Sequence, residues 1–294
     1  MNEFGKTVDK TYLSIDNAED RGFIHRDYIA HCLRWSHVVK RLYERKCYQS
    51  ARILDVGCGR ELPFAKTLYS SKLAPAMYYG VDAGPINDED VAKIAKTQKF
   101  AHKLWEHCNF LELTPQDVNY QEITTDVECD LLPNLVTCFE VLEHVEPKMM
   151  MDMLEHMKRL TTPDARFFIS TPCWNRTDCA ANHVNEMLYE SLGAAFERHG
   201  FVVENVYGTF ASIRDYEQLL VDRGLDVVFQ MLREYYDTNF LSCIFAPLFP
   251  AQSRNCLWEL RKKPEGQGMA HKFPPIEAVQ QPWSSSTKWE EMSL

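Results

Sequence analysis

Short apolar runs and amphipathic stretches alternate along the middle of the chain. Seven apolar runs predict buried strands, at residues 52–56, 77–81, 108–111, 135–139, 166–170, 201–207 and 255–260. Helical spacing of apolar positions predicts helices at about 61–73, 88–99, 148–160 and 185–199, the last ending at Gly200. This alternation indicates an α/β fold in which helices cover both faces of a mostly parallel sheet.

Segments outside this alternation divide the chain into three parts. Residues 1–49 form an N-terminal extension with an amphipathic, basic helix at about 24–45, and residues 50–263 form the α/β domain. Within that domain, residues 212–250 are predicted to be a helical insertion that ends in an apolar, proline-containing loop. Residues 264–294 are rich in Pro, Gln and Ser, which predicts a flexible tail.

Composition and charge narrow the classes of function. A chain of 294 residues with 45% hydrophobic residues can bury a full core, and it has no long uncharged apolar run, so we expect no contact with a membrane. The formal net charge of −10 argues against a uniformly basic surface for nucleic acid. Ten cysteines without a CxxC pair, together with a polar N-terminus, predict reduced thiols and a cytoplasmic location.

A glycine turn follows the first predicted strand. Residues 53–59 read Ile-Leu-Asp-Val-Gly-Cys-Gly, an apolar strand that leads into a Gly-x-Gly turn before a helix. Glycine allows close approach of the backbone to a ligand, and the helix N-terminus adds unpaired N–H groups. The second strand ends in Asp82, whose carboxylate can accept both hydroxyls of a ribose. Neither GxGxxG nor GK[ST] follows, which weakens a dinucleotide or P-loop interpretation.

Four more side chains are expected at the same edge of the sheet. Glu140, Glu143 and His144 follow the fourth strand, and His183 lies on the loop after the fifth strand. The carboxyl ends of neighbouring parallel strands face one cleft, so these side chains can meet there. Two carboxylates and two imidazoles suit a divalent cation, with Mg, Mn, Co and Zn as candidates. Without a cation, His144 or His183 is a candidate general base.

In order and spacing, these motifs resemble the class I S-adenosylmethionine (SAM)-dependent methyltransferases. The resemblance rests on ILDVGCG, GVD and LVTCFEVLEHV, and it covers roughly residues 50–210 and the strand near 255–260. It implies methyl transfer from SAM on a doubly wound, Rossmann-like sheet of seven strands with the last strand antiparallel. EVLEHV is similar to ubiquinone-pathway O-methyltransferases, and ExxEH with a later histidine is similar to small-RNA 2′-O-methyltransferases.

The resemblance also implies roles for individual residues. The methionine part of SAM would lie against Asp55, Gly57 and Gly59, and its ribose against Asp82. The adenine would lie beside residues after the third strand: Phe110 and Leu111, with Glu112 or Asp117 at its amino group.

The same segment after the fourth strand has two interpretations. In the two similar families, a divalent cation is associated with the matching residues, here Glu140, Glu143, His144 and His183. Many other methyltransferases use the segment without a metal, as strand end, cofactor contact and helix cap. In that case Glu140 is a cofactor contact, and Glu143, His144 and His183 have acid–base or structural roles.

Three kinds of function remain open for the methyl acceptor, and the sequence does not indicate an oligomeric state. The first is O-methylation of a small molecule, favoured by the acidic chain and by an insertion placed to cap the site. The second is methylation of nucleic acid, on a ribose 2′-OH or a base, because seven basic residues accompany two acidic ones from Arg26 to Arg52. The solvated face of an amphipathic helix explains that pattern equally well. The third is a SAM-binding protein without catalysis.

Overall fold

A seven-stranded sheet runs through the structure, a computed structural model that describes residues 26–46, 48–96, 101–119, 131–177, 179–268 and 270–284. The strand order is β3-β2-β1-β4-β5-β7-β6. Neighbouring strands pair in parallel except around β7, which runs antiparallel between β5 and β6. This is the doubly wound, mostly parallel sheet that the sequence predicts.

Six of the seven strands lie where the apolar runs predict them. The strands span Arg52–Val56 (β1), Met77–Val81 (β2), Ala101–Trp105 (β3), Leu135–Phe139 (β4), Arg166–Pro172 (β5), Phe201–Phe210 (β6) and Asn255–Lys262 (β7). The central strands are buried along most of their length, because helices pack on both faces and continuous apolar runs satisfy both contacts.

The third strand is the exception, and the prediction of a strand at 108–111 is wrong. β3 is an edge strand whose residues are exposed or half-buried, so it carries the polar residues His102 and Lys103 where an apolar run was expected. The run after it forms a 3-10 helix, η3 (Phe110–Glu112). The side chain of Asn109 starts this turn by accepting the N–H of Leu111 at 3.2 Å.

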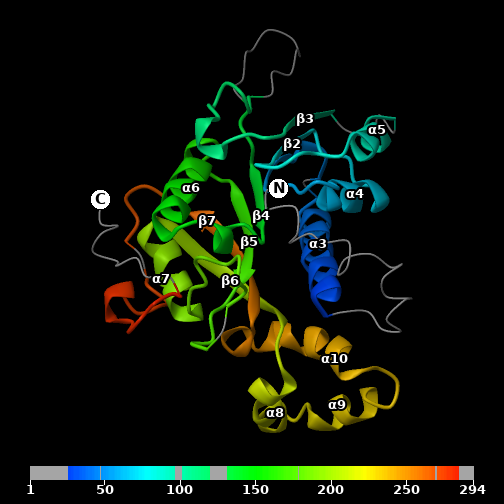
Figure 1. The fold of residues 1–294 in the computed structure, drawn as a ribbon, viewed down its shortest axis with the longest axis vertical. Helices are drawn as coiled ribbons and strands as arrows, with labels where there is room; N and C mark the ends of the chain where they lie inside the picture. The colour runs from blue at the N-terminus through cyan, green and yellow to red at the C-terminus, as the bar shows by residue number, and fades with distance from the viewer. Residues whose placement is uncertain are drawn as a thin grey trace.

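Helices cover both faces of the sheet (Figure 1). One face carries α6 (Pro147–Arg159) and α7 (Tyr189–Arg198), and the other carries α3 (Arg26–Glu44), α4 (Pro63–Ser70) and α5 (Asp88–Lys96). The predicted ends at 24–25 and 97–99 lie outside the described residues. Gly200 follows α7 with a φ of 75°, which confirms it as the helix stop. Among the helices described, none is both long and apolar enough to cross a membrane.

The insertion at 212–250 is a helical lobe at the carboxyl end of β6, the lower part of Figure 1. Its helices are α8 (Ile213–Asp222), α9 (Asp226–Leu232) and α10 (Thr238–Phe245), and they enclose an apolar cluster of their own. The apolar stretch expected as a loop is therefore mostly helix. Asp237 caps α10 by accepting the N–H groups of Asn239 and Phe240 at 2.7 and 3.1 Å. α10 is apolar on several sides because it contacts both α3 and β6.

The described part of the segment expected to be a flexible tail packs on the domain. Ile276 and Trp283 are each 2% exposed and belong to the apolar core around α6 and α7. Phe273 also packs against this core, directly over Gly193 of α7. Three large apolar side chains thus anchor a segment whose overall composition suggested flexibility. Residues 285–294 lie outside the described residues.

Candidate active site

The glycine turn after β1 has a backbone that only glycine adopts easily. Gly57 and Gly59 have φ angles of 71° and 75°, in the left-handed region. A Cβ atom on Gly57 would meet Cγ2 of Val141 at 2.2 Å, so the turn lies directly against the segment after β4. The N–H groups of Gly57 and Cys58 donate to the carbonyl of Val81, at 2.8 and 3.1 Å, so what the turn offers a ligand is a backbone without side chains at the two glycines.

Asp82 is held at the end of β2 by the same turn. Its Oδ2 accepts the N–H of Gly59 at 2.8 Å, and its Oδ1 accepts the N–H of Gly84 at 2.7 Å. A carboxylate offers about four lone-pair sites. The partly exposed side chain therefore keeps acceptor capacity for the two hydroxyls of a ribose, which fits the nucleoside of SAM.

Asp55 lies beneath the turn and is only 2% exposed. Its two carboxylate oxygens accept the hydroxyls of Thr137 at 2.6 Å and Tyr78 at 2.5 Å. Burial raises the pKa of Asp55 to about 6, although both hydrogen bonds act in the opposite direction. The residue joins the three central strands β1, β2 and β4, so its contact with the methionine part of SAM stays a prediction.

The residues expected around the adenine lie in and after η3. Phe110 is buried against the ring of His156 on α6, and Leu111 is half-buried. Of the two acidic candidates, Asp117 accepts from the backbone and hydroxyl of Thr114, whereas Glu112 accepts from the amide of Asn109 at 3.1 Å. The sequence carries a signal for Asn109 that was not used in the prediction, because a short polar residue just before an apolar run is typical of a cap.

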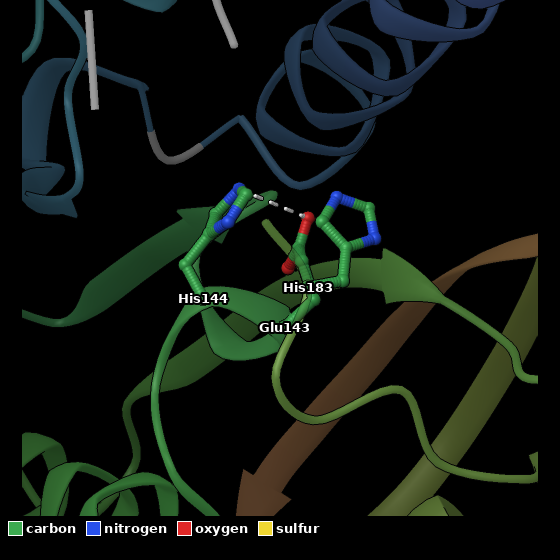
Figure 2. A group of neighbouring side chains, drawn as sticks. All are labelled: Glu143, His144 and His183. Carbon is green, nitrogen blue, oxygen red and sulfur yellow. Dashed lines mark ion pairs between the residues drawn. The ribbon is translucent and has the colours of Figure 1, made fainter. Parts of the chain in front are cut away.

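Glu143, His144 and His183 come together at the carboxyl edge of the sheet, as predicted (Figure 2). One potential ligand atom from each residue lies within 4.8 Å of the others. Glu143 and His144 belong to the 3-10 turn η4 (Leu142–His144) after β4, and His183 is on the loop after β5. That loop is fastened to η4, because the N–H groups of Val184 and Asn185 both donate to the carbonyl of Glu143, at 2.8 and 3.2 Å.

Both imidazole rings are oriented through their Nδ1 atoms. Nδ1 of His144 lies 3.1 Å from the carbonyl oxygen of Asn182, which only accepts, so this nitrogen carries the proton. Nδ1 of His183 lies 2.5 Å from Oε1 of Glu186 and donates to that carboxylate. The lone pair of the neutral His144 ring is then on Nε2, which is 3.8 Å from Oε1 of Glu143, and the contact of His183 with Glu186 leaves Nε2 as its other ring nitrogen. Burial lowers the pKa of His144, which favours the neutral ring.

Glu143 is a buried carboxyl group, and few contacts from the protein offset the cost of burying its charge. It is 1% exposed, and its Oε2 accepts the hydroxyl of Thr171 at 3.0 Å. Burial raises the pKa of Glu143 well above its usual range, and the nearby charge of Glu140 adds to the effect. A bound cation would relieve this cost, so a carboxyl and two imidazole lone pairs fit a divalent cation.

Glu140 is directed away from this group of three. Its φ is 56°, and its carboxylate lies 3.3 Å from Nη1 of Arg34 on α3. It also accepts from the Asn255 amide at 2.9 Å and from the Ser170 hydroxyl at 2.8 Å. Burial would raise the pKa of Glu140, but the charge of Arg34 and these hydrogen bonds lower it overall. Of the four expected metal ligands, three are therefore brought together, and Glu140 anchors the N-terminal helix. Its contact with the cofactor stays a prediction.

The fold and the turn define a class, doubly wound α/β proteins, in which ligands bind at the carboxyl edge of the sheet. The family follows from the sequence, in which residues 25–230 match the model described as methyltransferase domain. This match covers more than half of the chain, so the chain belongs to that methyltransferase family. It is an S-adenosylmethionine-dependent enzyme, and SAM is its methyl donor.

Several solved structures resemble the chain. The 1,6-didemethyltoxoflavin-N1-methyltransferase of Burkholderia thailandensis is 14% identical, with a TM-score of 0.48 over 89% of this chain and 88% of that one. The magnesium protoporphyrin IX methyltransferase of Synechocystis PCC 6803 is 13% identical, with a TM-score of 0.49 over 88% and 100%. The small RNA methyltransferase HEN1 is 16% identical, with a TM-score of 0.47 over 81% of this chain and 26% of that one. No curated protein matches the sequence.

Proposed function

We propose that the protein transfers the methyl group of SAM to a hydroxyl of a small molecule, assisted by a divalent cation at Glu143, His144 and His183. The observation that carries this proposal is the group of three ligand atoms within 4.8 Å. Both histidines hold Nδ1 in a hydrogen bond and keep the Nε2 lone pair. Histidines that bind metals are oriented in this way by a second acceptor.

In this reaction the residues of the chain mainly orient the two substrates and remove a proton. The methyl carbon of a sulfonium is already electrophilic, so catalysis consists mainly of alignment and proton removal. When bound, a cation lowers the pKa of a hydroxyl and fixes its oxygen. The turn at Gly57 and Gly59, together with Asp82, holds the cofactor at the ends of β1 and β2. Without a cation, Nε2 of His144 is the candidate base.

The contacts of the basic region support a small acceptor over a nucleic acid. Four of its five arginines make contacts within the fold: Arg34 with Glu140 at 3.3 Å, Arg41 and Arg45 with Glu259 at 2.8 and 2.7 Å, and Arg52 with the carbonyl of Leu132 at 2.8 Å. Binding to a phosphate backbone needs cations that are available at the surface. Three of the seven basic residues counted in the sequence thus dock α3 on the rest of the domain. The helical lobe at 212–250, which begins at the end of β6, keeps its predicted role as a substrate cap.

Calorimetry of the whole chain tests the proposal. We expect Mg²⁺, Mn²⁺, Co²⁺ or Zn²⁺ to bind the EDTA-treated protein, and Glu143→Gln and His183→Ala to weaken that binding by about tenfold or more. Both variants should keep SAM affinity within about threefold, whereas Asp82→Ala should lose SAM affinity and keep the cation. Cation binding that is unchanged in Glu143→Gln would overturn the metal site. Loss of SAM in Glu143→Gln as severe as in Asp82→Ala would overturn the division of roles.

An acceptor screen tests the substrate class. Catechol-like hydroxyl compounds and nucleosides with a ribose 2′-OH come first, followed by a short RNA. Turnover of a small hydroxyl compound that is indifferent to salt between about 50 and 200 mM supports the proposal. Turnover of RNA alone, with steep loss over the same range, would replace it with nucleic-acid methylation.

A further inference from the structure

The C-terminal segment reaches the active site through residues 282–284, called here the C-terminal strap. Trp283 pairs with Met187 as an antiparallel bridge, and the carbonyl of Pro282 accepts the N–H of Leu188 at 3.0 Å. Trp283 and Met187 are buried side chains of the core around α6 and α7. The strap is therefore anchored on the segment that follows His183.

The strap holds Glu186 on both sides of its backbone. The N–H of Glu186 donates to Oγ of Ser284 at 2.9 Å, and the carbonyl of Glu186 accepts the N–H of Ser284 at 2.9 Å. Glu186 is 6% exposed, and its carboxylate is the group that contacts Nδ1 of His183. One side chain thus connects the strap to a residue of the candidate cation site.

The segment that carries His183 is fixed on its other side by the sheet. The N–H groups of Val184 and Asn185 donate to the carbonyl of Glu143, and Met187 forms a parallel bridge with Cys173, just after β5. The segment therefore lies between the end of the sheet and the strap. The sheet fixes the backbone near His183, whereas the strap fixes the backbone of Glu186.

We propose that the C-terminal strap positions His183 through Glu186, so that residues at the far end of the chain set the cation affinity of the active site. Glu186 is a positioning residue in this arrangement, because it acts on His183 and not on substrate. A histidine ligand needs both its ring direction and its tautomer fixed, and a carboxylate on Nδ1–H fixes both. The effect on cation affinity rests on the proposed function, whereas the positioning of the His183 ring does not.

The ring nitrogens of His183 report this positioning in the cation-free protein. In full-length chain with ¹⁵N-labelled histidine, NMR at alkaline pH should show His183 protonated at Nδ1 and unprotonated at Nε2. Ser284→Pro removes both the Oγ acceptor and the N–H donor, and should give signals averaged between the two tautomers. Ser284→Ala, which removes only the acceptor, should give an intermediate shift. Ser284→Thr keeps both the hydroxyl and the N–H, so it is the matched control and should leave the signals unchanged.

Variants of Glu186 separate the carboxylate from the strap. Glu186→Ala should move the His183 signals at least as far as Ser284→Pro does, whereas Glu186→Gln keeps an acceptor and should largely restore them. If Glu186→Ala moves the signals and Ser284→Pro leaves them as in Ser284→Thr, the strap has no positioning role and the proposal is overturned. Unchanged signals in Glu186→Ala overturn it as well.

Titration with Mn²⁺ or Co²⁺ then measures the consequence. Glu186→Ala should weaken binding by about 10- to 100-fold, and Ser284→Pro by about three- to tenfold. SAM affinity should be unchanged in both variants, because the change at His183 is local. A general loss of structure would instead weaken the binding of both SAM and the cation. Equal cation affinity in Ser284→Pro and Ser284→Thr would overturn control of the site by the strap. If the parent chain binds no cation, the proposed function fails, and the ring signals alone decide whether the strap positions His183.

Discussion

Gly57 meets two separate demands at the turn after β1. Its φ of 71° strains any residue with a Cβ atom, and such an atom would also meet Val141 at 2.2 Å. Val141 stands two residues before Glu143, in the segment between β4 and η4. The contact therefore joins the cofactor turn to the segment that carries the candidate cation ligands.

We expect Gly57→Ala to lower the free energy of unfolding by about 2–4 kcal/mol, of which roughly 1–2 is backbone strain and the rest is the clash. It should also weaken SAM binding. Adding Val141→Ala should remove the clash and restore that part of the free energy of unfolding, whereas the backbone strain should remain. Urea unfolding in a double-mutant cycle measures both parts. If Gly57→Ala costs the same with and without Val141→Ala, the steric explanation is wrong.

Single residues differ in how far the sequence predicts them. Glu143, His144 and His183 follow neighbouring parallel strands, so topology alone brings them to one edge. Glu140 follows the same strand, but its positive φ and the charge of Arg34 direct it elsewhere. The position of Glu186 depends on pairing with residues about 100 positions later, which no local pattern shows.

At the scale of elements, α3 docks on the sheet through polar as well as apolar contacts. Glu259 of β7 is 0% exposed and accepts from Arg41 at 2.8 Å and Arg45 at 2.7 Å. The ring of His37 lies 4.3 Å from that of Tyr207 on β6. Since α3 covers β6 and β7 in this way, the N-terminal helix is a layer of the domain, and it falls within the matched family region.

His37 should make this docking sensitive to acid. Burial lowers the pKa of His37 from 6.5 to about 4, with Arg41 acting in the same direction and Glu259 against it. The unfolded chain then binds more protons than the folded one between these values, so stability falls as the pH drops from about 6.5 to about 4. His37→Gln should lose less stability over this window in urea unfolding at several pH values. Parallel stability curves for the parent and His37→Gln would contradict this.

The elements that the sequence misplaces have identifiable physical causes. β3 pairs on one side only, so it does not need the apolar run by which buried strands are found. α10 is apolar on several sides because it is packed between other elements, which hides its helical period. The N-cap residues Asn109 and Asp237 were the signals in the sequence that could have located the starts of η3 and α10. The other six strands, most of which are buried, are continuous apolar runs, and they were predicted in place.

At the scale of the whole molecule, three parts of the chain converge on the carboxyl edge of the sheet. α3 arrives through Arg34 and Glu140, the lobe at 212–250 through Asp215 and Arg254, and the C-terminal strap through Ser284 and Glu186. The division into 1–49, 50–263 and 264–294 stays a prediction. These contacts indicate that all three parts shape the surroundings of the site.

The contribution of the contact between α3 and β7 to stability can be measured at Glu259. Glu259→Gln leaves two arginines without their buried carboxylate, and should lower the free energy of unfolding by about 2–4 kcal/mol. Glu204→Gln is the matched control, because Glu204 also contacts arginines but is 23% exposed, and should cost less than about 1 kcal/mol. Urea unfolding followed by circular dichroism gives both values. Equal costs would show that burial of Glu259 adds nothing to docking.

The separation of Arg41 from Glu259 also bears on how the chain is made. The two residues are 218 positions apart, so α3 leaves the ribosome long before the strand that receives it. At about 5–20 residues per second, the interval is on the order of 10–40 s. Throughout that time Arg41 and Arg45 lack their buried carboxylate, although α4 and β1 are already available to the apolar face of the helix, and the loop to be closed is almost the length of the domain. Newly made chains are therefore most exposed to aggregation before translation ends, and slower synthesis lengthens that exposure.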